Sequence, residues 1–484
     1  MEQSQLVELI RILKPEERAQ ILHFAAIPFF NNGRMRDQVV PLLDVCLGHP
    51  LDFSGQRLEK SEVYAIVFPG QEVIAGKLEK VMVEAHKVVK SFLLTQRYFR
   101  EGNEFNQLLD FSEELRLRGL NTRFQQTTTK LQKMQSESII TDAQFYRRQY
   151  LLEASISNEE SIRNQAKGNL NFPNTLHALE LDFYLNRLVI LNHFLLQQKI
   201  AHLDFFEEIN LIINESNVPE RYLNESAVIK INYQIFLLLK KEYPTPTEVQ
   251  GLFELLLLHE KSIDSKMLLE FYTYLRNLCV LSLTADYEQV EMYNVLNKLY
   301  KDNLQRGYLH FEGKINRTRY WAVSSNAIYI GDLDWALEFI EKYKNEIRDE
   351  NETKDIYRLN LANYLFAKGK YSECLDNIPE SFSHVDYLLH SKRLELKSYY
   401  ELRSDLLPYK LDAFKMFLSR TSPKLLSATQ RQIHSDFANL LHQIVYSNPG
   451  NSKRPELLIK RIHEKKQSAE WRWLLEKAKA LKPG

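Results

Sequence analysis

The most regular feature of the chain is the spacing of apolar residues after Pro219, where they recur every three or four positions. That spacing is typical of amphipathic α-helices, each with one apolar stripe. The stretches pair along the chain, as 224–241 with 246–260, 264–283 with 286–303, 310–330 with 332–347, 354–368 with 370–378, and 384–402 with 404–419. Each pair alone would expose an apolar face, so we expect neighbouring pairs to stack in series and complete the core.

Two of these pairs carry turn residues at matching places. The first helix of one pair ends at Gly331 and is followed by Ala336, and Gly369 is followed in the same way by Cys374. A glycine supplies a left-handed helix cap, and a small residue five positions later lets two helices approach closely. Over about residues 220–420 the chain therefore resembles the tetratricopeptide repeat, although its spacing is slightly longer than the usual roughly 34 residues.

The whole chain also resembles a widespread group of uncharacterised bacterial helical-repeat proteins of similar length. The stretches that carry this likeness are 13–18, 27–32, 68–70, 334–343 and 396–402. The resemblance implies an architecture and no particular chemistry.

The rest of the chain is also predicted to be helical, so the fold class is all-α: a helix-pair, tetratricopeptide-like solenoid with an N-terminal helical unit. We expect an N-terminal helical domain over 1–100 and a middle helical region over 101–219, with a linker near 155–174 where helical periodicity is lost. The repeats cover 220–420. Capping helices over 421–484, at about 427–446, 453–466 and 469–481, would shield the last repeat from water.

Composition and charge narrow the choice of partners and location. The 63 basic residues balance 63 acidic ones, and the sequence pI is about 7.2. Phosphate neutralisation dominates duplex affinity, so we do not expect a nucleic-acid partner from this balance. The N-terminus lacks the features of a signal peptide, and no apolar run approaches the roughly 20 residues that span a bilayer. We therefore expect a cytoplasmic protein without membrane insertion.

Motifs for catalysis, cofactors and metals are not apparent. The 13 histidines form no HExxH pattern, and His177 and Glu180 lack the second helix pair that a di-iron site needs. No phosphate-binding glycine loop occurs, and Cys46, Cys279 and Cys374 lack flanking nucleophile motifs and are expected to be small buried core residues. We assign no catalytic, cofactor-binding or metal-binding residue and expect a protein that is not an enzyme.

A basic stretch near the N-terminus leaves one alternative open. Basic residues outnumber acidic residues over 77–100. The basic residues are Lys77, Lys80, Lys87, Lys90, Arg97 and Arg100. This helix could be the recognition helix of a winged-helix unit, which would make the chain a transcriptional regulator with a repeat sensor domain. A wing should follow as a β-hairpin, whereas 98–109 continues with helical spacing. A solvated helix face is the favoured interpretation.

The favoured function is a non-catalytic scaffold that binds a peptide or helix from a protein partner. In helical-repeat arrays the first helix of each pair lines the concave surface. The residues predicted to face it and bind the partner are Trp321, Ser325, Tyr329, Asn363, Phe366 and Ser398. An asparagine amide can donate to and accept from a peptide backbone, and aromatic rings supply desolvated contact area. For the larger side chains, packing between repeats is the competing explanation.

Overall fold

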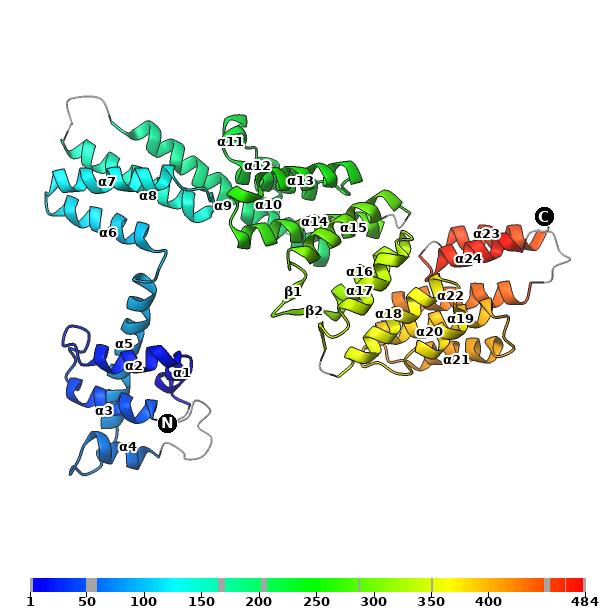
Figure 1. Cartoon of the computed structure of the whole chain (residues 1–484), viewed down its shortest axis with the longest axis horizontal. Coiled ribbons are helices and arrows are strands. Elements are labelled where there is room, and N and C mark those ends of the chain that lie inside the picture. The colour runs from blue at the N-terminus through cyan, green and yellow to red at the C-terminus, as the bar shows by residue number, and fades with distance from the viewer. Residues whose placement is uncertain are drawn as a thin grey trace. The chain divides into compact units, whose positions relative to one another are not determined.

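The computed structural model describes most of the chain, namely residues 3–48, 59–163, 170–201, 207–285, 288–349, 351–447, 453–465 and 467–481. These residues form 24 α-helices with three very short β-strands, which confirms the all-α class (Figure 1). The chain divides into two compact units, Met1–Asp182 and Phe183–Gly484, and each is described by itself.

The first unit begins with helices packed on one long helix. Their bounds are α1 (Gln5–Arg11), α2 (Pro15–Ala25), α3 (Arg36–Leu47), α4 (Lys60–Val67) and α5 (Lys77–Tyr98). Helix α5 contacts α1, α2 and α3, and its buried stripe includes Val81 and Phe92. Pro15 opens α2 at a position where a fixed φ and a missing N–H are both tolerated.

The first unit continues with α6 (Glu104–Leu117), α7 (Asn121–Ser136) and α8 (Ala143–Arg163). Helix α9 (Phe172–Ala201) crosses from this unit into the second. Within the stretch expected to be a linker, 155–163 is the end of α8 and α9 begins at Phe172. Residues 164–169 lie outside the described part. Ser157 and Glu159 are buried, which explains why polar residues there do not mark a loop.

The second unit is a succession of helices (Figure 1). Its early helices are α10 (Glu207–Asn214), α11 (Glu220–Glu225), α12 (Ala227–Lys240), α13 (Pro246–His259), α14 (Ser265–Ala285) and α15 (Val290–Gln305), with a 3₁₀ turn at Glu260–Ser262 after α13. Its later helices are α16 (Arg317–Tyr329), α17 (Leu333–Lys342), α18 (Thr353–Ala367), α19 (Tyr371–Asn377), α20 (Val385–Glu401), α21 (Leu407–Arg420), α22 (Ala428–Val445), α23 (Lys453–Glu464) and α24 (Trp471–Ala480). From α11 onward each helix contacts the next, and α12 contacts α14, α16 contacts α18, and α18 contacts α20.

A small sheet replaces the two outer ends of the helix pair predicted at 310–330 and 332–347. Strands β1 (His310–Phe311) and β2 (Lys314–Asn316) form an antiparallel hairpin, and β3 (Ile347–Arg348) pairs with β2 in parallel. The prediction of helix from 310 and up to 347 is wrong at both outer ends. Glu312 and Gly313 both have positive φ, the geometry of a two-residue hairpin turn. The Asn316 side chain then caps α16 by accepting from the Thr318 N–H at 2.8 Å.

The turns inside the repeat-like pairs follow the predicted glycine chemistry. Gly331 and Gly369 have φ of 82° and 76°, in the left-handed region. After Gly331, the Asp332 N–H donates to the Ala327 carbonyl at 2.9 Å, which satisfies an otherwise unpaired helix-end carbonyl. In the next pair, which lacks the glycine, Arg403 adopts φ of 52° at the equivalent place. The same cap geometry is therefore kept there at a steric cost.

Candidate partner-binding face

Three of the predicted site residues lie in one row on α16, spaced by about one helical turn. The Trp321 ring meets the His390 ring of α20 edge to face, with centroids 4.2 Å apart. The Ser325 hydroxyl is buried without a hydrogen-bond partner among the described residues. Tyr329 is 38% exposed, beside the Tyr293 ring at 4.0 Å. Trp321 therefore packs between helices, and Tyr329 is the most accessible of the three.

The remaining predicted residues lie on α18 and α20. Asn363 is half-buried, and its amide makes no hydrogen bond to the described part of the chain. Phe366 packs on Tyr371 at 5.3 Å and beneath the Lys397 ammonium at 4.5 Å. Ser398 is fully buried, and its hydroxyl donates to the Leu394 carbonyl at 2.9 Å. Asn363 thus presents a free amide, whereas Ser398 lies inside the fold.

The C-terminal helix α24 and the residue before it lie against α20. The Glu470 carboxylate pairs with Lys397 at 2.7 Å and with Arg393 at 3.2 Å. The Trp473 indole N–H donates to Glu401 at 2.8 Å, and the Arg472 guanidinium lies 4.7 Å from the centre of the Tyr329 ring. Part of the face predicted to bind a partner is therefore covered by the chain itself.

Charge at this contact is balanced inside the protein. Burial raises the pKa of Glu470, but the Lys397 and Arg393 cations lower it more, so its net shift is strongly downward. Burial and the Arg393 cation lower the pKa of His434 to about 4, and the same two causes lower that of His390 well below its usual value. At neutral pH the cluster holds an ionised glutamate and neutral histidines. These are the properties of a structural ion cluster.

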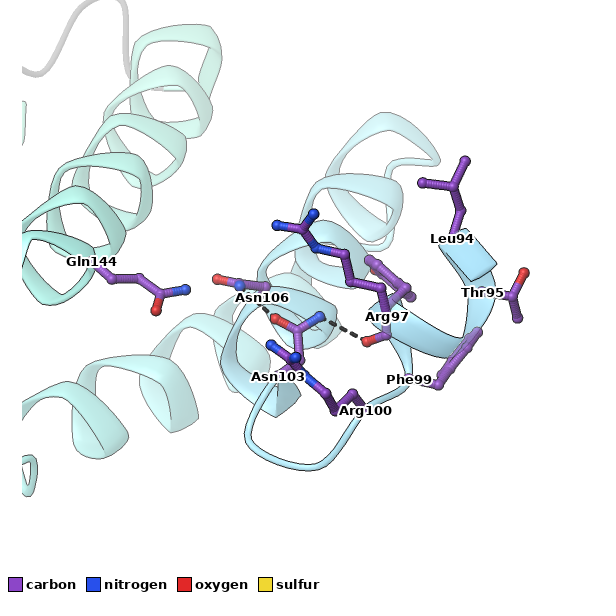
Figure 2. Close-up of a pocket in the computed structure, with 9 residues that line it drawn as sticks. Leu94, Thr95, Arg97, Phe99, Arg100, Asn103, Asn106 and Gln144 are labelled. Carbon is purple, nitrogen blue, oxygen red and sulfur yellow. Dashed lines mark hydrogen bonds between the residues drawn. The ribbon is translucent and has the colours of Figure 1, made fainter. Parts of the chain in front are cut away.

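A hollow of about 610 Å³ lies where α5 ends and α6 and α8 begin (Figure 2). One polar group that lines it completes the end of α5, since the Asn103 amide donates to the Tyr98 carbonyl at 2.7 Å; the same carbonyl accepts from the Gln107 amide at 2.8 Å. Figure 2 shows Gln144 of α8 across from the asparagine amides. Arg97 and Phe99 also line the hollow. Among the described residues, no carboxylate lines it.

The basic residues of α5 form an exposed stripe opposite its buried face. Lys80, Lys87, Lys90 and Arg97 are exposed and pair with no carboxylate of the described residues. Lys77 differs, because its ammonium lies 4.3 Å from the centre of the Phe68 ring. In the described range 59–163, α5 is followed by α6 and by no β-hairpin. A wing, the partner of a recognition helix in a winged-helix unit, does not follow there.

The three cysteines lie in buried surroundings that make their thiols unreactive. All three are free and buried, as predicted. Burial raises the pKa of Cys46 to about 12 and that of Cys374 to about 11, and it also raises that of Cys279. Each thiol is therefore protonated at neutral pH and is a poor nucleophile.

Neither a metal centre nor a membrane span is found in the same residues. Within the described ranges no group of three or more His, Cys, Asp or Glu side chains is placed to hold a metal ion. None of the helices there is both long and apolar enough to cross a bilayer.

Comparison with known proteins adds no family name. No protein-family model, curated protein or solved structure matches the chain. The likeness to tetratricopeptide repeats therefore depends on the chain's own features, such as the left-handed caps at Gly331 and Gly369. The sequence prediction also missed Glu470, whose partners lie more than 70 residues away, and no local motif marks such a contact.

Proposed function

We propose that this chain is a non-catalytic interaction scaffold whose helix pairs at about 220–420 form a tetratricopeptide-like array. A peptide or helix from a protein partner would dock across α16 and α18. The observation that carries the proposal is the placement of Tyr329 and the free amide of Asn363 on two adjoining first helices. Both side chains are partly accessible, and together they supply an aromatic surface and a backbone-binding amide.

The order of helix contacts supports an array. Each helix after α11 contacts its successor, and the first helices of successive pairs also contact each other at α16–α18 and α18–α20. When first helices pack directly on one another along a series of pairs, they form a continuous wall. A wall of this kind is the surface that repeat arrays use for extended partners.

Helix α24 sets one boundary of the docking face. Glu470 and Trp473 bond to α20, so the α20 part of the wall is occupied by the chain. Ser398, Trp321 and Phe366 act in packing and the Ser325 hydroxyl is buried, so the proposed face is reduced to Tyr329 and Asn363.

The regulator alternative has less support. The unpaired stripe on α5 is suited to phosphates, but α5 is followed in the described residues by α6. The balanced charge of 63 basic and 63 acidic residues also gives no general attraction to a duplex.

Affinity capture from native lysate tests the proposed face with the full-length chain as bait. We expect Tyr329→Ala and Asn363→Ala each to lower recovery of a specific partner about tenfold or more, as for contact residues at an interface centre. Tyr409→Ala and Asn439→Ala are matched controls, because both residues are exposed on other helices, α21 and α22. If Tyr329→Ala and Asn363→Ala both recover the partner as well as the wild type does, the partner does not use this face.

A further inference from the structure

The hollow at the end of α5 is lined by two arginines that have no acidic partner. Arg97 and Arg100 are exposed, line the same space of about 610 Å³, and pair with no carboxylate of the described residues. Figure 2 shows both side chains extending towards the Asn103 and Asn106 amides. Two cations that share one hollow repel each other, and a bound anion would relieve that repulsion.

A chain of hydrogen bonds holds the two asparagine amides of this wall. The Arg148 guanidinium of α8 donates from Nε to the Asn106 side-chain oxygen at 3.0 Å. The Asn106 amide donates to the Asn103 side-chain oxygen at 2.6 Å, and the Asn103 amide donates to the Tyr98 carbonyl at 2.7 Å. Each asparagine oxygen therefore already accepts a hydrogen bond, whereas each NH₂ group keeps one unused N–H. The wall presents hydrogen-bond donors to a ligand.

The same hollow also has a free amide and apolar surface. Gln144 is the second residue of α8, and its exposed amide makes no hydrogen bond to the described residues. Leu94 and Phe99 line the hollow and are 56% and 68% exposed, so methyl groups and a ring face are open to contact. The volume is within the range of small-molecule sites. A ligand here would carry acceptors and an apolar body.

A neighbouring hollow shows which side an anion would choose. It measures about 600 Å³ and shares Arg97, Phe99 and Arg100, but Glu16 and Glu17 of α2 also line it. Carboxylates repel an anion at short range. The hollow towards α6 and α8 is lined by no carboxylate of the described residues, so the anion is expected on that side.

We propose that the hollow at the end of α5 binds a small organic anion, in which a carboxylate or phosphate group is joined to an apolar ring. Arg97 and Arg100 bind the oxyanion, because planar guanidinium forks match the oxygens of both groups. The Asn106 and Gln144 amides donate to it, and Phe99 contacts the ring. The site lies wholly in the first unit and does not depend on the docking face proposed for α16 and α18.

Saturation-transfer NMR on the full-length chain tests the site with defined probes. Phenyl phosphate and benzoate each combine a ring with an oxyanion, and benzyl alcohol carries the ring alone. At constant ionic strength, we expect saturation to pass from the protein to the ring protons of phenyl phosphate, benzoate or both, and not to those of benzyl alcohol. The ratio of the two Kd values shows whether phosphate or carboxylate is preferred.

Substitutions then locate the bound probe. Arg97→Met and Arg100→Met should each raise its Kd about fivefold, as expected for loss of one exposed charge contact. Arg34→Met, at an exposed arginine before α3 that pairs with no described carboxylate, should leave the Kd unchanged. Gln144 lines the proposed hollow and Gln96 lines only the neighbouring one, so Gln144→Ala should raise the Kd and Gln96→Ala should not.

All of the substituted residues are exposed, so each variant should keep the wild-type Tm. Absence of transfer to both anions in the wild type, or equal transfer to benzyl alcohol, would overturn the proposal. An equal loss in Arg34→Met would show unspecific attraction of anions, and a loss in Gln96→Ala alone would place the probe in the neighbouring hollow. Either result also overturns the site. The outcome of partner capture with Tyr329→Ala has no bearing on these measurements, because they need no partner.

Discussion

Two arginines of the second unit, Arg276 and Arg393, have opposite surroundings. Arg393 on α20 pairs with Glu470 at 3.2 Å and contacts two histidines, whereas Arg276 on α14 has only neutral acceptors in the described residues. Both lie on first helices of pairs. The difference is that α24 and the residue before it cover α20 and bring a carboxylate to it. Where α24 and the residue before it cover α20, the charge of Arg393 is balanced inside the protein, whereas Arg276 is paired with no carboxylate of the described residues.

The largest effect should come from removing the acid of the covered region. Glu470→Gln leaves Arg393 and Lys397 buried without their counter-ion, and breaking such a cluster costs about 3–5 kcal/mol. Urea unfolding followed by circular dichroism measures the loss. Glu476→Gln is the control, because that exposed carboxylate pairs only with neighbouring Lys477 among the described residues and should change stability by less than about 0.5 kcal/mol. Equal effects would mean that Glu470 does not hold α24 on α20.

Acid should weaken the same region. The pKa of His434 is lowered to about 4, so between pH 6.5 and 4 the unfolded chain binds a proton that the folded chain does not. Stability is full above pH 6.5 and falls as the pH drops towards 4, by about 3 kcal/mol from this histidine. His434→Gln should flatten the profile measured by urea unfolding, and exposed His463→Gln should not. A steep profile retained in His434→Gln would assign the acid sensitivity to other groups.

Matched substitution of the two arginines sharpens the contrast. Arg393→Met leaves Glu470 with Lys397 alone, and we expect a loss of about 2–3 kcal/mol. Arg276→Met removes a buried cation that has no described acid beside it, so stability should stay within about 1 kcal/mol of wild type or rise. Urea midpoints of both variants provide the test. A large loss for Arg276→Met would indicate that its bonds to Asn303 and Thr273 are structural.

The smallest effect on stability is expected at the open face. Asn363→Ala removes an amide that bonds to no described residue, so the free energy of unfolding should change by less than about 0.5 kcal/mol. The same variant should lose the partner in capture. Calorimetry on the purified variant checks the first part. A marked drop in Tm would place Asn363 among the packing residues instead.

Most helices after Pro219 could be predicted to within a few residues because their apolar stripes are regular. For α13 the sequence predicts 246–260 and the structure has Pro246–His259. For α18 the sequence predicts 354–368 and the structure has Thr353–Ala367. The hairpin before α16 was missed because strands of two or three residues are too short to show alternation. Gly313 was the available signal, since it follows Glu312 in a two-residue turn.

The candidate site was less predictable than the helices. Apolar periodicity shows which face of a helix is buried or exposed, but it does not show which other segment of the chain covers that face. Trp321 and Tyr329 share a face of α16, yet one packs on His390 and the other stays partly accessible. The covering segment around Glu470 lies far along the chain, and its left-handed φ of 57° has no sequence signal such as glycine. Arg276 likewise becomes notable only when its neighbours show that no described acid reaches it.

The central claim is that a partner docks on the wall formed by α16 and α18, beside the part covered by α24. Amide hydrogen exchange of the full-length chain, with and without the captured partner, measures this directly. The account predicts slower exchange on partner binding at Arg317–Tyr329 and Thr353–Ala367, with little change in Leu407–Arg420 of the second helix of its pair, α21. Protection confined to other helices, with exchange at α16 and α18 unchanged, would contradict it.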